Sequence, residues 1–363
     1  EKKNFEIVLL VANKSHKVLM KQAKAFNVKN LIITNKKNYE ILKKETIKTD
    51  IKVFNDFAQM NKIFKKKIDY VLSSISGIQG LEPTTKIIKF TKKIAIANKE
   101  SIICGWNLIQ AELKKHKTEF IPVDSEHFSI WYGLKNFKTA NLEKVFLTAS
   151  GGPFYKTTLN NFKKIKVSDA LNHPNWKMGK KISIDSATMI NKVYEVIEAK
   201  KVFNIGYQKI KILIHPKSYI HAILKFNNGL TNIIVHDTTM KVPIFNTLFL
   251  NSNRKLKTNK INTKILNNLD LNNVNVTRYP MVKLLNFLPD NHSLFETVIV
   301  AANDKLVELF LSNKIKFTDI QKKLFKIIKK KEFQKFKKIL PSNISDITNL
   351  NYYVRLKIDE NNI

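Results

Sequence analysis

Cysteine, arginine and long apolar runs are scarce in this chain, and each scarcity excludes a class of protein. Cys104 is the only cysteine among 363 residues, so an internal disulfide framework is excluded and a reducing compartment, the cytoplasm, is expected. No apolar run is long enough to cross a bilayer, and the first residues lack the pattern of a secretory signal, so we expect no membrane partner. The hydrophobic fraction of 44% is typical of a globular protein with a buried core.

The scarcity of arginine bears on the strong positive charge. The formal net charge is +35, which suggests a partner rich in phosphates. Arginine, the residue best suited to bidentate contacts with phosphates and bases, occurs only at positions 254, 278 and 355. The lysines are spread along the whole chain instead of forming one stripe. We therefore expect no nucleic-acid partner, although a basic nucleic-acid-binding protein stays open as an alternative.

The first third of the chain alternates between short apolar runs and stretches of helical length. This alternation predicts βαβ units and a parallel sheet, as in Rossmann-like nucleotide-binding domains. We assign residues 1–123 to this α/β domain. The predicted strands are Ile7–Val11, Leu31–Thr34, Ile51–Phe54, Tyr70–Ser74, Ile94–Ala97 and Phe120–Val123.

Glycine is also rare, and no Gly-x-Gly-x-x-Gly turn follows the first predicted strand. Such a turn holds the pyrophosphate of a dinucleotide at a helix N-terminus. The chain enters its first strand almost immediately after Glu1. We therefore expect an N-terminally truncated chain whose first βα unit is missing, and we expect it to bind a dinucleotide poorly.

The remaining sequence divides into three parts. Residues 124–250 are predicted to form an α+β catalytic domain with a flap near 171–181, and the polar stretch 251–283 is predicted to be a linker. Residues 284–363 are predicted to form a helical bundle, because their apolar positions follow helical spacing. One such helix has a predicted buried face and nearby capping residues, namely Ile320, Leu324, Ile327 and Ile328, with Thr318 and Asp319 as caps.

Three acidic residues could hold a metal ion. Asp124 and Glu126 lie two apart where an apolar stretch ends, and on an extended segment they would point to the same side. Glu195 lies far downstream, one helical turn beyond Asn191. Carboxylates suit hard divalent cations, and zinc-type spacings are missing, so Mg²⁺ or Mn²⁺ is preferred. Acids at a solvent-facing strand end are the alternative for the first pair.

A second group of residues suits an anion. Ser150-Gly151-Gly152 follows a predicted strand, and glycines there allow backbone N–H groups to converge on a phosphate. Lys99 also follows a strand, and His173 lies in a segment that could close over a ligand as a flap. A tight turn and an ordinary surface lysine are the alternatives. The other singled-out histidines, His127, His215 and His221, are predicted to be structural.

Five motifs together resemble those of the 1-deoxy-D-xylulose 5-phosphate reductoisomerase family, in order and in spacing. They are Ala-Asn-Lys-Glu-Ser at 97–101, Pro-Val-Asp-Ser-Glu-His at 122–127, Ser-Gly-Gly-Pro-Phe at 150–154, His-Pro-Asn-Trp-Lys-Met-Gly at 173–179 and Asp-Ser-Ala-Thr-Met-Ile-Asn-Lys at 185–192. The resemblance implies an NADPH- and metal-dependent enzyme of the methylerythritol phosphate route to isoprenoids. Such an enzyme rearranges its sugar-phosphate substrate to 2-C-methyl-D-erythrose 4-phosphate, an aldehyde that NADPH then reduces. A homodimer is also implied.

The resemblance also implies residue roles. The implied metal ligands are Asp124, Glu126 and Glu195, which with Lys99 form the implied catalytic set. The implied substrate-binding residues are Lys99, Ser125, Glu126, Ser150, His173, Trp176, Met178, Ser186, Asn191, Lys192 and Glu195. The implied NADPH-binding residues are Asn13, Lys14, Ser15, Asn98, Glu100 and Gly179.

The chain departs from the family pattern at several positions. Bulky Val193 and Tyr194 stand where the family has Gly-Leu, Phe128 replaces a small or polar residue, and Thr238-Thr239 replaces Pro-Asp. These changes affect the expected shape of the pocket and spare the expected ligands. Another NADP-dependent oxidoreductase without an isomerisation step remains an alternative, although it has no need of three acids around one cation.

Overall fold

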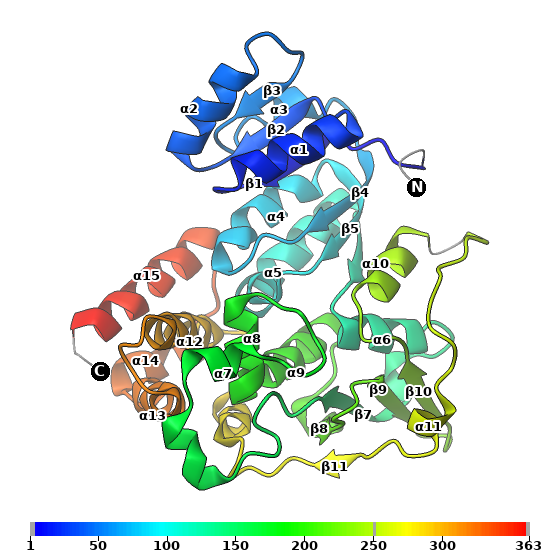
Figure 1. The fold of residues 1–363 in the computed structure, drawn as a ribbon, viewed down its shortest axis with the longest axis vertical. Coiled ribbons are helices and arrows are strands. Elements are labelled where there is room, and N and C mark those ends of the chain that lie inside the picture. The colour runs from blue at the N-terminus through cyan, green and yellow to red at the C-terminus, as the bar shows by residue number, and fades with distance from the viewer. Residues whose placement is uncertain (1–3, 250–251, 361–363) are drawn as a thin grey trace.

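The computed structural model describes residues 4–249 and 252–360. Its N-terminal part contains six parallel strands in two sheets of three, with orders β1-β2-β3 and β4-β5-β6 (Figure 1). The strands are β1 (Leu9–Ala12), β2 (Asn30–Ile33), β3 (Lys52–Phe54), β4 (Ile68–Ser73), β5 (Thr91–Ile96) and β6 (Glu119–Pro122). Each overlaps one of the predicted strands. The predicted parallel pairing is therefore present, and the described strands pair within each group of three.

Helices connect successive strands, as in βαβ units. They are α1 (His16–Phe26), α2 (Lys36–Glu45), α3 (Met60–Ile63), α4 (Leu81–Ile88) and α5 (Lys99–His116). The side chain of Asn98 begins α5 by accepting the backbone N–H of Ser101 at 2.7 Å. This cap places Lys99 and Glu100 in the first turn of the helix, directly after β5.

The middle of the chain forms a mixed sheet of five strands, in the order β10-β9-β7-β8-β11. Its strands are β7 (Leu142–Ala149), β8 (Ile210–Ile214), β9 (Ile220–Phe226), β10 (Thr231–Val235) and β11 (Asn272–Asn273). The helices of this region are α6 (Ser125–Gly133), α7 (Val167–Leu171), α8 (Lys180–Thr188), α9 (Ile190–Phe203), α10 (Lys241–Leu248) and α11 (Thr263–Leu266). Helix α6 contacts β9 and β10, and α9 contacts β7 and β8.

The stretch predicted as a linker is partly ordered. Its strand β11 pairs antiparallel with β8 and so completes one edge of the five-stranded sheet. The predicted start of the linker, between residues 250 and 251, lies outside the described residues.

The C-terminal part is helical, as predicted, with α12 (Phe295–Leu311), α13 (Phe317–Ile328), α14 (Lys331–Gln334) and α15 (Ile344–Glu360). The four apolar residues of the predicted face on α13 are buried. The carboxylate of Asp319 accepts the backbone N–H of Lys316 at 2.9 Å, which caps this helix as predicted. Thr318 makes no such contact, and Lys316 is the N-cap residue.

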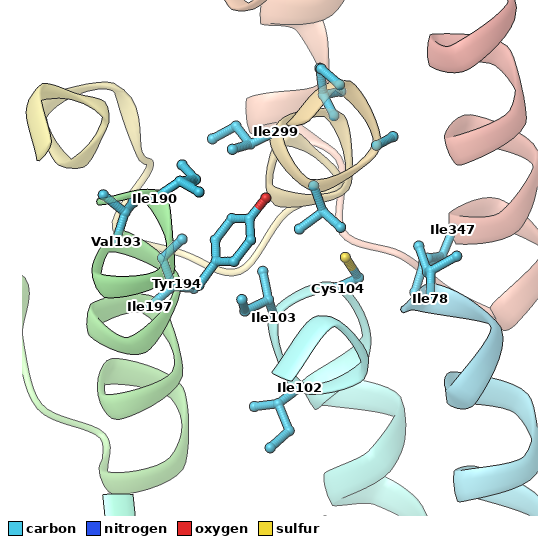
Figure 2. Packing of buried hydrophobic residues seen from close by; sticks show 14 of the residues in the cluster. Ile78, Ile102, Ile103, Cys104, Ile190, Val193, Tyr194, Ile197, Ile299 and Ile347 are labelled. Carbon is cyan, nitrogen blue, oxygen red and sulfur yellow. The ribbon is translucent and has the colours of Figure 1, made fainter. Parts of the chain in front are cut away.

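One hydrophobic core joins the C-terminal helices to the rest of the molecule. Side chains of α5, α9, α12 and α15 belong to the same buried cluster. Figure 2 shows Tyr194 of α9, Ile103 of α5 and Ile299 of α12 within this core. Because these helices share a core, the start of α5 and the start of α9 are held in a fixed relation. The site described next depends on that relation.

Candidate functional site

The predicted site residues lie where strands end and helices begin. Strands β5 and β6 are parallel neighbours, so their carboxyl ends meet at one edge of the sheet. Lys99 follows β5, and Asp124 follows β6. The expectation that Asp124 and Glu126 share an extended segment is wrong: Asp124 is the N-cap residue of α6, and Glu126 lies in the first turn of that helix.

Glu195 reaches this edge from α9. It lies within the first turns of that helix, after Asn191 and Lys192, as the predicted helical spacing requires. One carboxylate oxygen from each of Asp124, Glu126 and Glu195 lies within 4.8 Å of the others. Three oxygen donors this close form a potential site for a hard divalent cation.

Two buried lysines contact these carboxylates. The ammonium of Lys99 lies 2.8 Å from Asp124 Oδ2 and 3.3 Å from Glu195 Oε1. The ammonium of Lys192 lies 2.5 Å from Glu126 Oε1 and also pairs with Glu195. The amide of Asn191 donates to Glu195 and accepts from Lys99 at 2.8 Å. The acids are therefore held in place by cations and hydrogen bonds of the protein itself.

The protonation of the three acids follows from burial and these lysines. Burial opposes ionisation of Glu126, but Lys192 outweighs it and lowers the pKa of Glu126 to about 2. Burial likewise opposes ionisation of Asp124, but Lys99 and His127 hold its pKa well below its usual range. Burial and the neighbouring Glu126 together raise the pKa of Glu195. A divalent cation beside Glu195 would favour its ionised form.

His127 supports two of the three acids. Its Nε2 lies 2.8 Å from the backbone oxygen of Glu195, so Nε2–H donates there, and its Nδ1 faces Asp124 Oδ2 at 3.8 Å. Nδ1 also lies 3.5 Å from Glu198 Oε2. The prediction that His127 is a structural histidine agrees with this buried position behind the acids.

The segment after β7 forms the second side of the site. Gly151 and Gly152 have φ angles of +85° and +67°, which L side chains rarely adopt. A Cβ atom on Gly152 would lie 3.1 Å from the backbone oxygen of Ser186, so the turn also packs tightly against α8. The hydroxyl of Ser150 accepts the backbone N–H of Gly152 at 3.1 Å. Ser150 and Ser186 therefore lie close together at this turn.

The predicted flap residue His173 contacts this turn. Its Nδ1 accepts the backbone N–H groups of Asn175 and Trp176 at 3.2 and 3.0 Å, which places the proton of the neutral ring on Nε2. Nε2 then donates to Ser150 Oγ at 3.1 Å. Burial lowers the pKa of His173 to about 4, so the neutral ring is the form present near pH 7. His173 can therefore serve an anion as a hydrogen-bond donor.

All of the predicted metal and substrate residues line one cavity of about 190 Å³. They are Lys99, Asp124, Ser125, Glu126, Ser150, His173, Trp176, Met178, Ser186, Asn191, Lys192 and Glu195. The structure thus brings together segments that lie up to 96 residues apart in the chain.

The sequence analysis assigned no ligand-binding role to several further cavity residues, among them Met189, Met240 and His221. Met189 lies between α8 and α9 with φ of +69°, a left-handed conformation that turns Ser186 and Asn191 toward the same cavity. Methionine gives no sequence signal for this conformation. Met240 also lines the cavity. So does His221, which the sequence predicts to be structural and whose ring stacks on that of His236 at 3.6 Å.

Unlike the predicted metal and substrate residues, the six residues expected to bind NADPH do not line this cavity. Asn13, Lys14 and Ser15 are exposed in the loop after β1. The amide of Asn98 donates to the backbone oxygens of Ile75 and Gly77. The carboxylate of Glu100 pairs with Lys181. A Cβ atom on Gly179 would meet no atom within 4 Å, so open space adjoins this residue.

Parallel strands that end at a cavity of acids and lysines define an α/β enzyme. Comparison with known proteins identifies which one. Residues 1–105 match the family model for 1-deoxy-D-xylulose 5-phosphate reductoisomerase, residues 120–203 match the model for its C-terminal domain, and residues 236–356 match the DXP reductoisomerase C-terminal domain. The chain belongs to the 1-deoxy-D-xylulose 5-phosphate reductoisomerase family, which confirms the resemblance.

Individual relatives agree. The 1-deoxy-D-xylulose 5-phosphate reductoisomerase of Pelagibacter ubique (strain HTCC1062) is 59% identical over 360 residues, covering 99% of this chain and 93% of the relative. That of Clostridium kluyveri is 36% identical over 323 residues, covering 88% of this chain and 84% of the relative.

Solved structures show the same fold. The Zymomonas mobilis enzyme in complex with NADPH superposes with a TM-score of 0.85 at 28% identity, covering 98% of this chain and 92% of that one. A DOX-P reductoisomerase in complex with NADPH, fosmidomycin and magnesium superposes with a TM-score of 0.88 at 26% identity, covering 99% of this chain and 93% of that one. These likenesses confirm the expected fold class.

Proposed function

We propose that this chain catalyses the metal-dependent rearrangement of 1-deoxy-D-xylulose 5-phosphate and its reduction by NADPH. The observation that supports this best is the meeting of Asp124, Glu126 and Glu195 beside two buried lysines, in one cavity with Ser150 and Ser186. An enzyme of this family needs such a combination, because its substrate carries both chelating oxygens and a phosphate. A reductase without isomerisation and a nucleic-acid-binding protein explain neither the acids nor the family membership.

The three acids suit a Mg²⁺ or Mn²⁺ ion. Their oxygens are close enough to share one ion, and they are hard donors. A bound ion would polarise a substrate carbonyl and stabilise negative charge on its oxygen. The side chains of Lys99 and Lys192 compensate the charge of the acids, and this keeps the donor atoms together in a buried place.

Lys99 holds the middle of the substrate in this proposal. Burial opposes its charge, but Asp124 and Glu195 outweigh burial and hold the pKa of Lys99 well above its usual range. The ammonium therefore stays charged throughout the physiological range. We assign it to hydrogen bonding with substrate oxygens next to the reacting carbons, together with the hydroxyl of Ser125.

The side of the cavity at the turn after β7 suits the substrate phosphate. It offers hydroxyls from Ser150 and Ser186 and the Nε2–H of His173. We also assign Asn191 and Lys192 to the phosphate, although both contact the acids as well. Trp176 and Met178 belong to the same cavity wall and come from the predicted flap. Contacts with the phosphate would orient the substrate and keep the flap closed, which excludes water from the reacting carbons.

NADPH, which supplies the hydride, is assigned to the carboxyl ends of the N-terminal strands. The exposed loop at Asn13, Lys14 and Ser15 fits this role, because a lysine and two polar side chains at the end of a parallel strand can hold a phosphate. The side chain of Asn98 is committed to the protein, so its contribution would be to hold the loop after β4 through Ile75 and Gly77. Gly179 has the open space that a ligand needs.

The domain assignment follows the same division. We assign 1–123 to the cofactor, 124–250 to the metal and substrate with the flap near 171–181, 251–283 to the connection and 284–363 to a supporting helical part. The shared core of α5, α9, α12 and α15 supports this last role, because the C-terminal helices brace the two helices that carry Lys99 and Glu195.

We also propose a homodimer in the cytoplasm. Strand β10 lies at one edge of the five-stranded sheet, with Leu230 and Ile233 exposed on or beside it. An exposed apolar edge strand is a ready surface for pairing with a second copy. The single buried cysteine, Cys104, is compatible with a reducing compartment. None of the described helices is sufficiently long and apolar to span a membrane.

The function is tested by following NADPH oxidation with 1-deoxy-D-xylulose 5-phosphate, with and without Mg²⁺ or Mn²⁺. We expect metal-dependent oxidation and a product with a branched carbon skeleton, identified by NMR. A reduced product with the original unbranched skeleton would support a plain reductase and refute the proposal. Retention on DNA or RNA at moderate salt would instead support the nucleic-acid alternative.

A further inference from the structure

A second charged cluster lies outside the cavity, around Lys181. This lysine is in the first turn of α8, and its ammonium meets carboxylates from three helices. It pairs with Glu100 of α5, with Asp185 of its own helix at 3.1 Å, and with Asp304 of α12 at 3.0 Å. The cluster thus joins a helix from each of the three parts of the chain.

The acids of the cluster are largely buried, and the side chain of Lys181 is 30% exposed. The side chains of Glu100, Asp185 and Asp304 are 9%, 3% and 17% exposed. The amide of Asn303 donates to Asp185 at 2.8 Å. Burial raises the pKa of Asp304 to about 7, against the attraction of Lys181. One ammonium therefore compensates three buried acids, and its removal would leave them unpaired.

Two of the three acids are adjacent in the chain to a residue of the cavity. Glu100 follows Lys99 in the chain, and Asp185 precedes Ser186. Lys181 itself is the last residue of the predicted flap, two residues beyond Gly179. The ammonium consequently ties the start of α5, which carries Lys99, to the end of the flap and to the helix that carries Ser186.

We propose that Lys181 is a positioning residue that keeps Lys99 correctly placed relative to the phosphate-binding side of the cavity. The proposal rests on the proposed function, since it assigns the two ends of the cavity to one substrate. Lys181 contacts no substrate itself and acts through Glu100 and Asp185. A cluster that only stabilised the fold would affect unfolding and leave the geometry of the cavity unchanged.

The test compares Lys181→Met, Lys181→Arg and Lys180→Met in the full chain. Lys180 is the exposed neighbour on the same helix and serves as the matched control. We expect Lys181→Met to lower kcat/KM about 100-fold, as expected for a misplacement of about 1 Å, with weaker binding of inorganic phosphate measured by calorimetry. Lys181→Arg should restore most of both values, and Lys180→Met should leave both unchanged.

The phosphate measurement needs no turnover, so it separates this proposal from the proposed function. Inactivity of the wild type would refute the function, while the phosphate affinities would still decide the role of Lys181. If Lys181→Met does not fold, Glu100→Gln replaces it in the same measurements. This variant removes the ion pair between Lys181 and Glu100 and keeps the size of the side chain, and the cluster holds more acids than lysines, so the loss of one negative charge is tolerated. Phosphate affinity and kcat/KM equal to those of Lys180→Met, with only Tm lowered, would overturn the proposal.

Discussion

Replacing Glu195 by glutamine removes one negative charge from the proposed metal site and keeps the shape of the side chain. Glu195 is 1% exposed and contacts Lys99, Lys192 and Asn191. We expect Glu195→Gln to abolish turnover without unfolding the protein, because the charge matters to the cation more than to the fold.

The expected losses of stability and of metal affinity follow from the contacts that the two lysines keep in Glu195→Gln. Lys99 keeps its 2.8 Å contact with Asp124, and Lys192 keeps its 2.5 Å contact with Glu126, so neither cation is left alone. Burial and Glu126 already raise the pKa of Glu195, so its charge contributes less to the stability of the fold than its contacts alone suggest. Glu195→Gln should therefore lower the free energy of unfolding by no more than about 1–3 kcal/mol, the size of one or two hydrogen bonds to charged groups. Metal affinity should fall at least about 100-fold, because even indirect partners of metal ligands contribute about 10–100-fold.

The assay combines Mn²⁺ binding by electron paramagnetic resonance, NADPH oxidation and thermal unfolding. Glu143→Gln is the control, because Glu143 is an exposed carboxylate that pairs with Lys225 on the five-stranded sheet. The control should behave as the wild type in all three measurements. Near-normal Mn²⁺ affinity and turnover in Glu195→Gln would refute the metal assignment.

Three further predictions concern metal, pH and the core. Chelation by EDTA should stop turnover and leave the circular dichroism spectrum unchanged, because Lys99 and Lys192 compensate the acids; unfolding on chelation would contradict this. Burial lowers the pKa of His173 from 6.5 to about 4, so the stability linked to its neutral form is complete above pH 6.5 and is lost as the pH falls toward 4. His173→Gln should flatten the fall of Tm across that range, and an unchanged slope would show that His173 does not contribute. The hydroxyl of Tyr194 is buried without a hydrogen-bond partner in the core that Figure 2 shows, so Tyr194→Phe should raise the free energy of unfolding by about 1–2 kcal/mol in urea denaturation; destabilisation would reveal a partner for the hydroxyl.

Local sequence patterns were sufficient for the strands and for the helical spacing of the site. The six N-terminal strands are apolar, β-branched runs bounded by polar sequence, and such runs are a property of the chain itself. Asn191, Lys192 and Glu195 lie within one helix, so their spacing alone places them together. Motif order gave the remaining members of the cavity, including Ser150 and His173, and the structure places them there.

Other features depended on contacts between distant segments. Asp124 begins a helix instead of continuing an extended segment, because α6 packs against β9 and β10, which come much later in the chain. Met189 adopts a left-handed conformation because α8 and α9 must both pack on the core, which no property of methionine predicts. The cavity position of His221 likewise depends on the pairing of β9 with β7 and β10.

The sequence by itself determined the six N-terminal strands, the family and the set of charged residues that the site would use. Tertiary structure alone decided which acid meets which lysine, since Lys99 and Glu195 are 96 residues apart and are joined only by packing of α5 against α9. The same holds for the cluster around Lys181, whose three acids come from three helices. Propensity acts over a few neighbouring residues, whereas the energy of a buried ion pair depends on an environment that exists only after the helices have packed.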